Sequence, residues 1–275
     1  MSAVVHRDSA NRWWPSPLVA ASIGVHVVAI AAPCIELGLW TWALLAVVAN
    51  QALLTLGVLW PRSRLLGPNF TRLSPAAAAR GEIALTFDDG PSPELTPKVL
   101  DLLASRGMRA TFFCVAEKAA RHPELMREIA LRGHEVGNHS HSHSAAFACL
   151  GLRGLRRDID TAQSILMETA GRAPRFFRPP MGFRSPLLDP VLHALGLRLV
   201  TWTRRGYDTL HGDAAKVAAR LERDLAAGDI LLLHDGRCAR TPSGDPVVLE
   251  VLPRLLDAIQ GQGLKPVRLD QAIDP

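Results

Sequence analysis

Hydrophobic residues follow two different patterns along this chain, one in the first sixty residues and another in the remainder. Between Trp13 and Trp60 the sequence has no Lys, Arg or Asp, and Glu36 alone carries a formal charge at neutral pH. A single α-helix of that length would measure about 70 Å, more than twice the roughly 30 Å thickness of a bilayer's hydrocarbon core. The segment therefore has to turn back on itself, and Pro33 and Gly38 beside Glu36 predict where it does so.

The turn divides the segment into two apolar passes, at about 17–32 and 39–59, which we interpret as a transmembrane helical hairpin. It would contact the lipid bilayer through residues of about 17–60. Tryptophans fall where such a hairpin would cross a membrane interface, namely at Trp13, Trp14, Trp40, Trp42 and Trp60. Two alternatives stay open. The hairpin could be buried in a soluble protein, or its short first pass, with Ala29-Ile30-Ala31, could belong to a cleaved signal peptide.

Basic residues that flank the hairpin bear on its orientation in a bacterial-type cell membrane. Arg7 and Arg12 precede the first pass, and Arg62 and Arg64 follow the second, whereas the connecting turn has no basic residue. The positive-inside rule then places both ends of a multi-pass anchor on the cytoplasmic face. The domain that follows the hairpin would share that face.

After the hairpin, short strand-like runs alternate with amphipathic helical stretches. Residues 61–80 contain three prolines and four consecutive alanines, which predict a linker between an anchor of residues 1–60 and a domain of residues 81–275. The alternation predicts an α/β fold with about seven parallel strands, which can close into a barrel. The expected strands are 83–87, 110–115, 135–138, 175–178, 197–203, 230–233 and 264–269. The clearest helices are 97–105, 123–131, 155–170, 213–226 and 247–260.

Composition narrows the class of protein further. With 275 residues, 48% of them hydrophobic, the chain can bury one full-sized domain core beside the hairpin. The net charge is +5, but the arginines are scattered and lack the Lys/Arg blocks with interleaved aromatics that nucleic-acid binding favours, so no nucleic acid partner is expected. Cys114, Cys149 and Cys238 have no paired spacing that indicates a disulfide framework or a zinc knuckle. Nothing in the sequence indicates an oligomeric state.

Four polar motifs each begin where a strand-like run ends, so a parallel sheet would collect them at one edge. The first motif is Asp88-Asp89-Gly90. Adjacent side chains of a regular strand point to opposite faces, but a turn at the strand's end can direct both carboxylates toward one cleft. Two neighbouring carboxylates repel unless a cation or a shared proton relieves them, which indicates a metal ion. The alternative is an ordinary Asp-Asp-Gly turn.

Histidines form the second motif. His139 and His143 are four residues apart, so on a helical turn their imidazoles would lie on one face within reach of one ion, and His141 would point elsewhere. Two imidazoles and one carboxylate make a facial ligand set that leaves positions open for water and substrate. Zn²⁺ fits such a set, and Co²⁺ and other divalent ions tolerate it as well. An accidental polar loop is the alternative.

The third and fourth motifs are the segment from Arg178 to Gly182 and the histidine that follows three leucines, His234. The prolines of the former predict a rigid segment that fixes the guanidinium and presents backbone N–H groups from Met181 onward to the cleft. His234 would enter the cleft from an apolar wall that includes Leu232, where an imidazole needs a carboxylate partner to stay charged. Taken separately, a bend with a solvent-facing arginine and a core histidine are the alternatives.

Together, in this order, the four motifs resemble those of the polysaccharide deacetylase family, also called carbohydrate esterase family 4 and characterised by the NodB homology domain. The resemblance covers about residues 81–270. It implies a distorted (β/α) barrel and a metal-dependent hydrolase that removes N-acetyl groups from amino sugars of a polysaccharide or a lipid-linked glycan. Such substrates are usually met outside the cytoplasm, which favours the opposite membrane face from the flanking charges.

The resemblance also implies roles for individual residues. Asp88 would be the catalytic base, His234 the catalytic acid, and Arg178 the residue that orients the base. The N–H of Met181 would bind the oxyanion. The predicted metal ligands are Asp89, His139 and His143, and the predicted substrate-binding positions are Met181, Pro180 and Leu232.

The chain departs from the family pattern at two places. Met181 stands where the family often has Tyr, which matters little if the backbone N–H binds the oxyanion. The family's Asp-x-x-Asp-Trp motif is here Arg205-Gly206-Tyr207-Asp208-Thr209 and keeps only its second Asp. We expect Asp208 to position Arg178 or His234. Two other hypotheses remain: a hydrolase of another non-peptide C–N bond, such as a formamide, and a non-catalytic membrane-bound protein of this fold that binds glycan.

Overall fold

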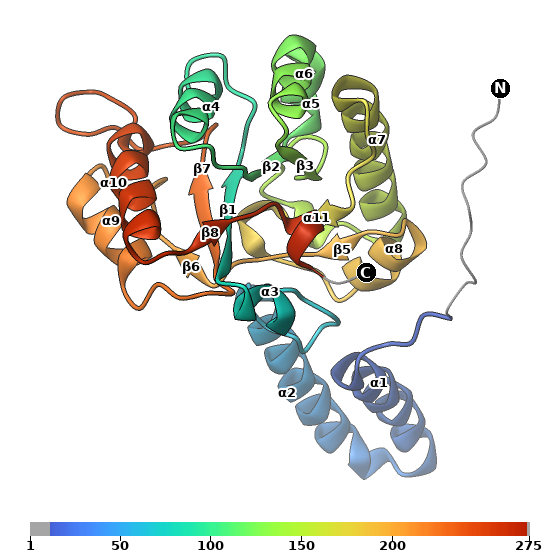
Figure 1. The fold of residues 1–275 in the computed structure, drawn as a ribbon. Coiled ribbons are helices and arrows are strands. Elements are labelled where there is room, and N and C mark those ends of the chain that lie inside the picture. The colour runs from blue at the N-terminus through green and yellow to red at the C-terminus, as the bar shows by residue number, and fades with distance from the viewer. Residues whose placement is uncertain (1–11, 274–275) are drawn as a thin grey trace.

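The computed structural model describes residues 12–273, and in it a helical hairpin projects from an α/β domain (Figure 1). The hairpin consists of α1 (Pro17–Ile35) and α2 (Trp40–Leu59), joined by the short 3-10 helix η1 (Leu37–Leu39). Both helices are long and apolar enough to cross a membrane by length and composition, with mean hydropathies of 2.2 and 1.9. The two expected apolar passes are therefore both helical.

The hairpin differs from the prediction at its turn. Pro33 lies inside the last turn of α1 and does not end the helix. The helix ends at Ile35, and the chain reverses from Glu36, whose backbone is extended (φ −146°, ψ 118°). Of the basic residues that flank the first pass, Arg12 is described, whereas Arg7 lies outside the described residues.

Apolar side chains cover the outside of the hairpin. Ile30 is 75% exposed and Leu37 is 82% exposed. Where the helices meet, the amide of Asn50 donates a hydrogen bond of 2.9 Å to the hydroxyl of Ser22, so these two buried polar groups satisfy each other. An exposed apolar surface of this extent indicates contact with lipid or with another protein.

Parallel strands form the sheet of the domain. Seven of them follow the order β5-β4-β3-β2-β1-β7-β6, and β8 pairs with the start of β1. The predicted α/β fold with about seven parallel strands is thereby confirmed. The strands are β1 (Glu82–Asp88), β2 (Thr111–Cys114), β3 (Glu135–Asn138), β4 (Phe176–Phe177), β5 (Arg198–Leu199), β6 (Arg204–Arg205), β7 (Ile230–His234) and β8 (Lys265–Pro266).

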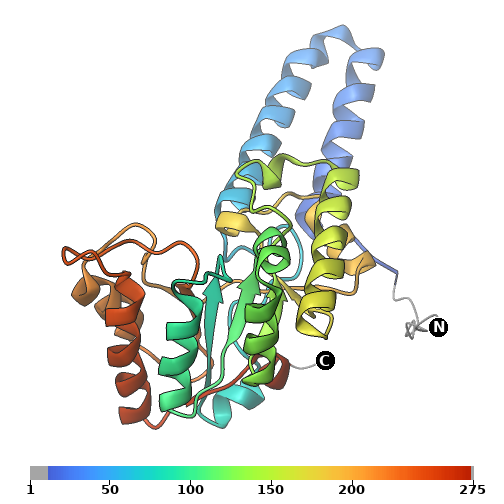
Figure 2. The same ribbon diagram turned by 90° about the horizontal axis from the view of Figure 1, so that it is seen from above.

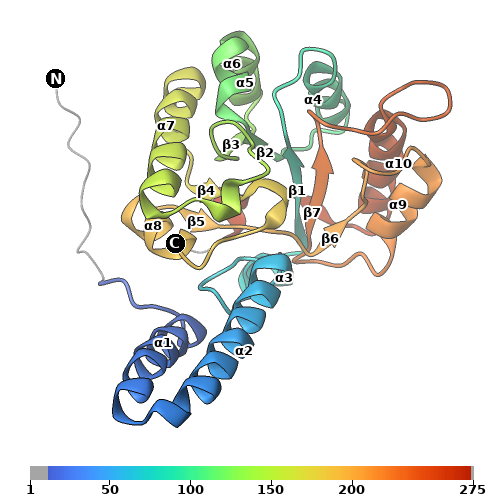
Figure 3. The ribbon, with the colours of Figure 1, turned by 180° about the vertical axis from the view of Figure 1, so that it is seen from behind.

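Helices follow most strands and pack on the outer face of the curled sheet, as the views from opposite sides show (Figures 1 and 3). Besides two short 3-10 segments, the described part of the domain contains α3 (Pro75–Ala79), α4 (Thr96–Ser105), α5 (Ala116–Arg121), α6 (Pro123–Leu131), α7 (Leu152–Ala170), α8 (Leu188–Ala194), α9 (Ala214–Glu222), α10 (Val247–Gly261) and α11 (Leu269–Ala272). The helices α4, α6, α7, α9 and α10 agree with the predicted ones to within a few residues, whereas α5 and α8 were not predicted.

The segment after the hairpin is part of the domain's packing. Phe70 forms a parallel bridge with Val200, which follows β5, and Arg72 forms an antiparallel bridge with Asp229, which precedes β7. Residues 70–72 therefore pair with chain from both halves of the sheet, across the open side of the half-barrel. The stretch expected as a linker thus has structural contacts of its own.

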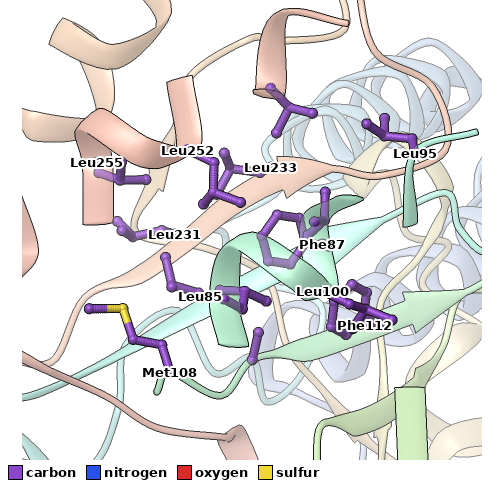
Figure 4. Packing of buried hydrophobic residues seen from close by; sticks show 14 of the residues in the cluster. Leu85, Phe87, Leu95, Leu100, Met108, Phe112, Leu231, Leu233, Leu252 and Leu255 are labelled. Carbon is purple, nitrogen blue, oxygen red and sulfur yellow. The ribbon is translucent and has the colours of Figure 1, made fainter. Parts of the chain in front are cut away.

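A continuous hydrophobic core lies between the sheet and its helices (Figure 4). Leu85 and Phe87 of β1 point to the same side as Leu231 and Leu233 of β7, because alternate residues of a strand share a face. The rings of Phe87 and Phe112 stack with centroids 5.0 Å apart. Since β1 is central and buried on both faces, its end is a rigid position for chemistry.

The hairpin projects from one side of the domain (Figure 2), and polar contacts hold its base there. The guanidinium of Arg184, 2% exposed, donates to the backbone oxygens of Ser63 and Gly67 just after α2. Before α1, the indole of Trp13 donates to the carboxylate of Asp189 at the start of α8, at 2.8 Å. Both ends of the hairpin are thereby tied to the same face of the domain.

Candidate active site

The polar motifs meet at the carboxyl-terminal edge of the sheet. Asp88 is the last residue of β1, His139 follows β3 directly, and His234 ends β7 beside Asp88 in register. All three line one cavity of about 700 Å³. The expectation that a parallel sheet would gather these motifs in one cleft is therefore confirmed.

Arg178 holds Asp88 in place. Its guanidinium is fully buried and donates to Asp88 Oδ1 at 2.7 Å and to the hydroxyl of Thr86 at 2.9 Å. The remaining N–H groups donate to the backbone oxygens of Val200 and Thr201. Burial lowers the pKa of Arg178, and the Asp88 carboxylate opposes this change. With Oδ1 held in this way, Oδ2 is the oxygen of Asp88 left to act toward the cavity.

Asp89, His139 and His143 bring three ligand atoms together, all within 4.8 Å of one another. Asp89 has a left-handed backbone (φ 70°), which turns its side chain back toward the end of β1. His139 Nε2 lies 3.4 Å and His143 Nε2 3.0 Å from Asp89 Oδ1. This atom is buried and has no hydrogen-bond partner among the described residues.

The protonation of His139 tests whether this cluster suits a cation. Its Nδ1 lies 2.7 Å from the backbone oxygen of Arg178 and must donate, since a carbonyl oxygen only accepts. In the neutral ring, Nε2 then presents a lone pair to Asp89 Oδ1, and two lone pairs repel. A divalent ion between them removes the repulsion, and the fixed Nδ1–H is the arrangement typical of metal-binding histidines. The three residues therefore fit a metal ion.

The two histidines do not lie on a helical turn, contrary to the expected reason for their proximity. They lie in the loop after β3, where Ser140 (φ 67°) and His143 (φ 53°) both have left-handed backbones. The hydroxyl of Ser140 accepts a hydrogen bond from the N–H of His143 and tightens the loop. As expected, His141 points elsewhere, with its Nδ1 3.8 Å from Glu117.

The two imidazoles favour the ionised form of Asp89. Burial by itself would raise the pKa of Asp89, but the neighbouring imidazoles of His139 and His143 hold it well below its usual range. Asp89 is therefore an anion, which is the form that binds a cation.

His234 is held by Asp208. Its Nδ1 donates to Asp208 Oδ1 at 2.8 Å, and its backbone N–H donates to Asp208 Oδ2 at 2.8 Å. Burial disfavours the charged imidazole, but the buried Asp208 carboxylate outweighs it and raises the pKa of His234. Of the two partners expected for Asp208, the structure thus gives His234 and not Arg178. His234 Nε2 is the nitrogen free to face the cavity.

The predicted substrate-binding positions differ in their access to the cavity. Met181 and Leu232 line it, whereas Pro180 is buried and does not. Met181 has a left-handed backbone (φ 57°) in the 3-10 turn η3 (Pro180–Gly182). Gly182 follows, also with positive φ, and a Cβ there would lie 2.6 Å from Trp202. The turn therefore needs its glycine for close packing.

Comparison with known proteins identifies the family to which the chain belongs. Residues 76–200 match the family model described as polysaccharide deacetylase. Along 194 residues the chain is 45% identical to a peptidoglycan-N-acetylglucosamine deacetylase of Bacillus cereus, covering 69% of this chain and 67% of that protein. It is 34% identical over 188 residues to a chitooligosaccharide deacetylase of Sinorhizobium fredii, covering 66% and 86% respectively. The chain belongs to the polysaccharide deacetylase family.

Among solved structures, the family 4 carbohydrate esterase from Streptomyces lividans in complex with acetate has 30% sequence identity and a TM-score of 0.63. The similarity covers 71% of this chain and 98% of that one. The distorted barrel that the resemblance implied is thus the fold of this polysaccharide deacetylase.

Several cavity residues were not predicted as functional. Leu59, the last residue of α2, lines the catalytic cavity together with Trp202, Arg205 and Leu210.

A further residue not predicted as functional is Asp235, which is fully buried beside His234 in the chain. Asp235 accepts a hydrogen bond from the hydroxyl of Thr96, and burial raises its pKa to about 7. Its position directly after His234 was the one available signal in the sequence. For Leu59 there was none, because its role depends on how the hairpin docks.

The ligand geometry leads to a prediction for metal binding. Replacing His139 or His143 by Ala should weaken Zn²⁺ binding at least a hundredfold, because a direct ligand is lost and the other two cannot enclose the ion. Isothermal titration of the purified full chain with Zn²⁺ measures the affinity. His141→Ala is the matched control and should bind as the unchanged protein does. Equal loss in all three variants would contradict the assignment.

Proposed function

We propose that this protein is a metal-dependent N-deacetylase that hydrolyses the N-acetyl group of an amino sugar in a glycan. One observation carries the proposal. Asp88, positioned by Arg178, and His234, positioned by Asp208, line the same cavity as the Asp89/His139/His143 cluster. A base and an acid beside a cation site are what metal-assisted amide hydrolysis requires.

Each side chain has a definite task in this reaction. When bound, the divalent ion polarises the acetyl carbonyl and makes water more acidic. Asp88 accepts the proton of the attacking water at Oδ2, because Arg178 occupies Oδ1. The N–H of Met181 stabilises the negative charge on the former carbonyl oxygen. His234 donates the proton at Nε2 to the departing amine, while Asp208 keeps the ring charged and oriented. The products are acetate and a free amino sugar.

Zn²⁺ is the ion we propose for the site. Two imidazoles and one carboxylate form the three-ligand arrangement of catalytic zinc sites with an open position. Co²⁺ and other divalent ions can occupy the same ligands. Deacetylases of this family are metal-dependent, and the Asp89/His139/His143 cluster is where this chain would hold its metal.

The substrate is an N-acetylated glycan. The relatives' names specify peptidoglycan N-acetylglucosamine and chitooligosaccharides, two glycans that share N-acetylglucosamine. We therefore propose N-acetylglucosamine or a close analogue as the sugar that enters the cavity.

We further propose that residues 1–60 anchor the protein in a membrane through α1 and α2, and that residues 81–275 form the catalytic domain. The support is the length and hydropathy of the two helices and their exposed apolar surface. Arg12, Arg62 and Arg64 lie at the domain end of the hairpin and favour the cytoplasmic face.

The roles of base and acid predict the kinetics of two variants. Asp88→Asn and His234→Ala should each lower kcat for acetate release by about 10² to 10⁴, because a positioned proton-transfer group contributes that much. Acetate release from N-acetylated chitotetraose by the Zn²⁺-loaded full chain measures this. Asp160→Asn, an exposed change on α7, should retain full activity. Near-normal turnover of either active-site variant would show that the assigned role is wrong.

Loss of the Asp208 carboxylate predicts a change in pH dependence. Asp208 raises the pKa of His234, so the Asp208→Asn protein should hold a less basic imidazole. The protonated acid then disappears at lower pH, and the alkaline limb of the kcat profile should move toward acid. The acid limb, set by other groups, should move less. A uniform loss of kcat at every pH would mean that Asp208 does not tune His234.

Membrane anchoring predicts how the chain distributes in cells. The full chain should sediment with membranes, resist extraction by high salt or alkaline carbonate, and dissolve in detergent. A C-terminal alkaline phosphatase fusion should be inactive and a green fluorescent protein fusion fluorescent if the domain faces the cytoplasm. The reverse reporter pattern would place the domain outside. Recovery of the chain in the soluble fraction would rule out the anchor.

A further inference from the structure

A second cavity lies beside the catalytic one. It has a volume of about 650 Å³ and is lined by the end of α2, the segment from Trp202 to Tyr207, and α9. Five arginines line it, and no acidic residue does: Arg62, Arg204, Arg205, Arg220 and Arg223. We refer to it as the arginine pocket.

Most of this positive charge is not neutralised by the protein. Arg204 forms an ion pair with Asp229. The other four arginines make no ion pair with a carboxylate anywhere in residues 12–273; Arg62 and Arg220, for example, donate to the backbone oxygens of Thr203 and Gly206. Like charges gathered in a concave site raise the local concentration of an anion. The pocket is thus suited to a ligand with more than one negative charge.

Aromatic rings hold one of these guanidinium groups in position. The guanidinium carbon of Arg205 lies 5.5 Å from the ring centre of Trp202 and 4.9 Å from that of Tyr207, and Arg220 lies 5.4 Å from the same tyrosine ring. Arg205 Nε is buried and has no hydrogen-bond partner among the described residues. Because this nitrogen is shielded from the pocket, the terminal N–H groups of the stacked guanidinium are the ones available to phosphate, whose oxygens accept parallel N–H bonds.

The arginine pocket opens onto the catalytic cavity. Pro61, Trp202 and Arg205 line both of them. Trp60, which caps α2, lines the arginine pocket, and Leu59 lines the catalytic cavity. Tryptophan at the end of an apolar helix marks the level of lipid headgroups in a bilayer. The two cavities therefore meet where the hairpin would leave the membrane.

We propose that the arginine pocket binds the phosphate or diphosphate that joins the substrate's amino sugar to a membrane lipid. This inference rests on the proposed deacetylase function and specifies its substrate class. The lipid chain would lie along the apolar surface of α2, the phosphate groups at the level of Trp60, and the N-acetylated sugar in the adjoining catalytic cavity. An uncharged polysaccharide strand would leave four arginine side chains without a counter-charge.

A matched pair of substrates tests the proposal. One is N-acetylglucosamine linked through a diphosphate to a polyprenyl chain, and the other is the methyl glycoside of the same sugar, both given to the Zn²⁺-loaded full chain in detergent. The double variant Arg220→Gln/Arg223→Gln should raise KM for the lipid-linked substrate at least tenfold. Its kcat/KM for the methyl glycoside should stay within twofold, because neither arginine lines the catalytic cavity.

Two further variants separate charge from structure. Arg220→Lys/Arg223→Lys keeps the charge and should recover much of the affinity for the lipid-linked substrate. Arg121→Gln/Arg127→Gln removes two exposed arginines from α5 and α6, far from the hairpin in Figure 1, and should leave both substrates unaffected. An equal loss for both substrates in the Gln variant, or no change in KM for the lipid-linked one, would overturn the proposal.

Binding measurements distinguish this inference from the proposed function. Polyprenyl diphosphate without a sugar should bind the unchanged protein, with an affinity that falls at high salt and in the Gln variant. If that binding is seen but no substrate releases acetate, the pocket assignment stands and the deacetylase function fails. If inorganic pyrophosphate binds equally well, or if phosphatidylglycerol vesicles compete as strongly as polyprenyl diphosphate, the pocket holds a free anion or an ordinary bilayer lipid. Either result would overturn the proposal.

Discussion

The buried guanidinium of Arg178 is the interaction on which the site depends. It links three parts of the sheet, since it follows β4, donates to Asp88 on β1, and donates to the backbone after β5. Its own carbonyl oxygen fixes the tautomer of His139. Such a buried ion pair contributes little net stability after desolvation. Its value is positional, because one side chain sets the geometry of both the base and a metal ligand.

Much of the site could be predicted because parallel strands impose it. Asp88 and His234 end neighbouring strands in register, so their proximity follows from the topology alone. The closeness of His139 and His143 was predicted for the wrong reason. A helical spacing suggested it, but a loop with two left-handed residues produces it. Backbone conformations of this kind depend on tertiary contacts and leave only a weak signal in the sequence.

Contacts between distant segments were outside the reach of sequence patterns. The expected linker pairs with chain on both halves of the sheet through Phe70 and Arg72. The sequence did not predict this pairing, because the composition of this short extended stretch is that of a loop. Leu59 reaches the cavity because Arg184 and Trp13 dock the hairpin. No periodicity of α2 distinguishes that residue from the other leucines around it. Domain boundaries read from composition therefore miss functional contacts that cross them.

In the altered Asp-x-x-Asp-Trp motif, one residue positions the catalytic histidine and another lines the cavity. Its retained member, Asp208, still positions His234, whereas Arg205 adds a positive side chain to the cavity wall at the position of the motif's first Asp. The change is local, yet Arg205 lies where the catalytic cavity meets the arginine pocket. Arg62 belongs both to that pocket and to the charges that flank α2. A positive charge at Arg62 then has a ligand-binding reason, so this residue is weaker evidence for membrane orientation than Arg12 and Arg64, which line neither cavity.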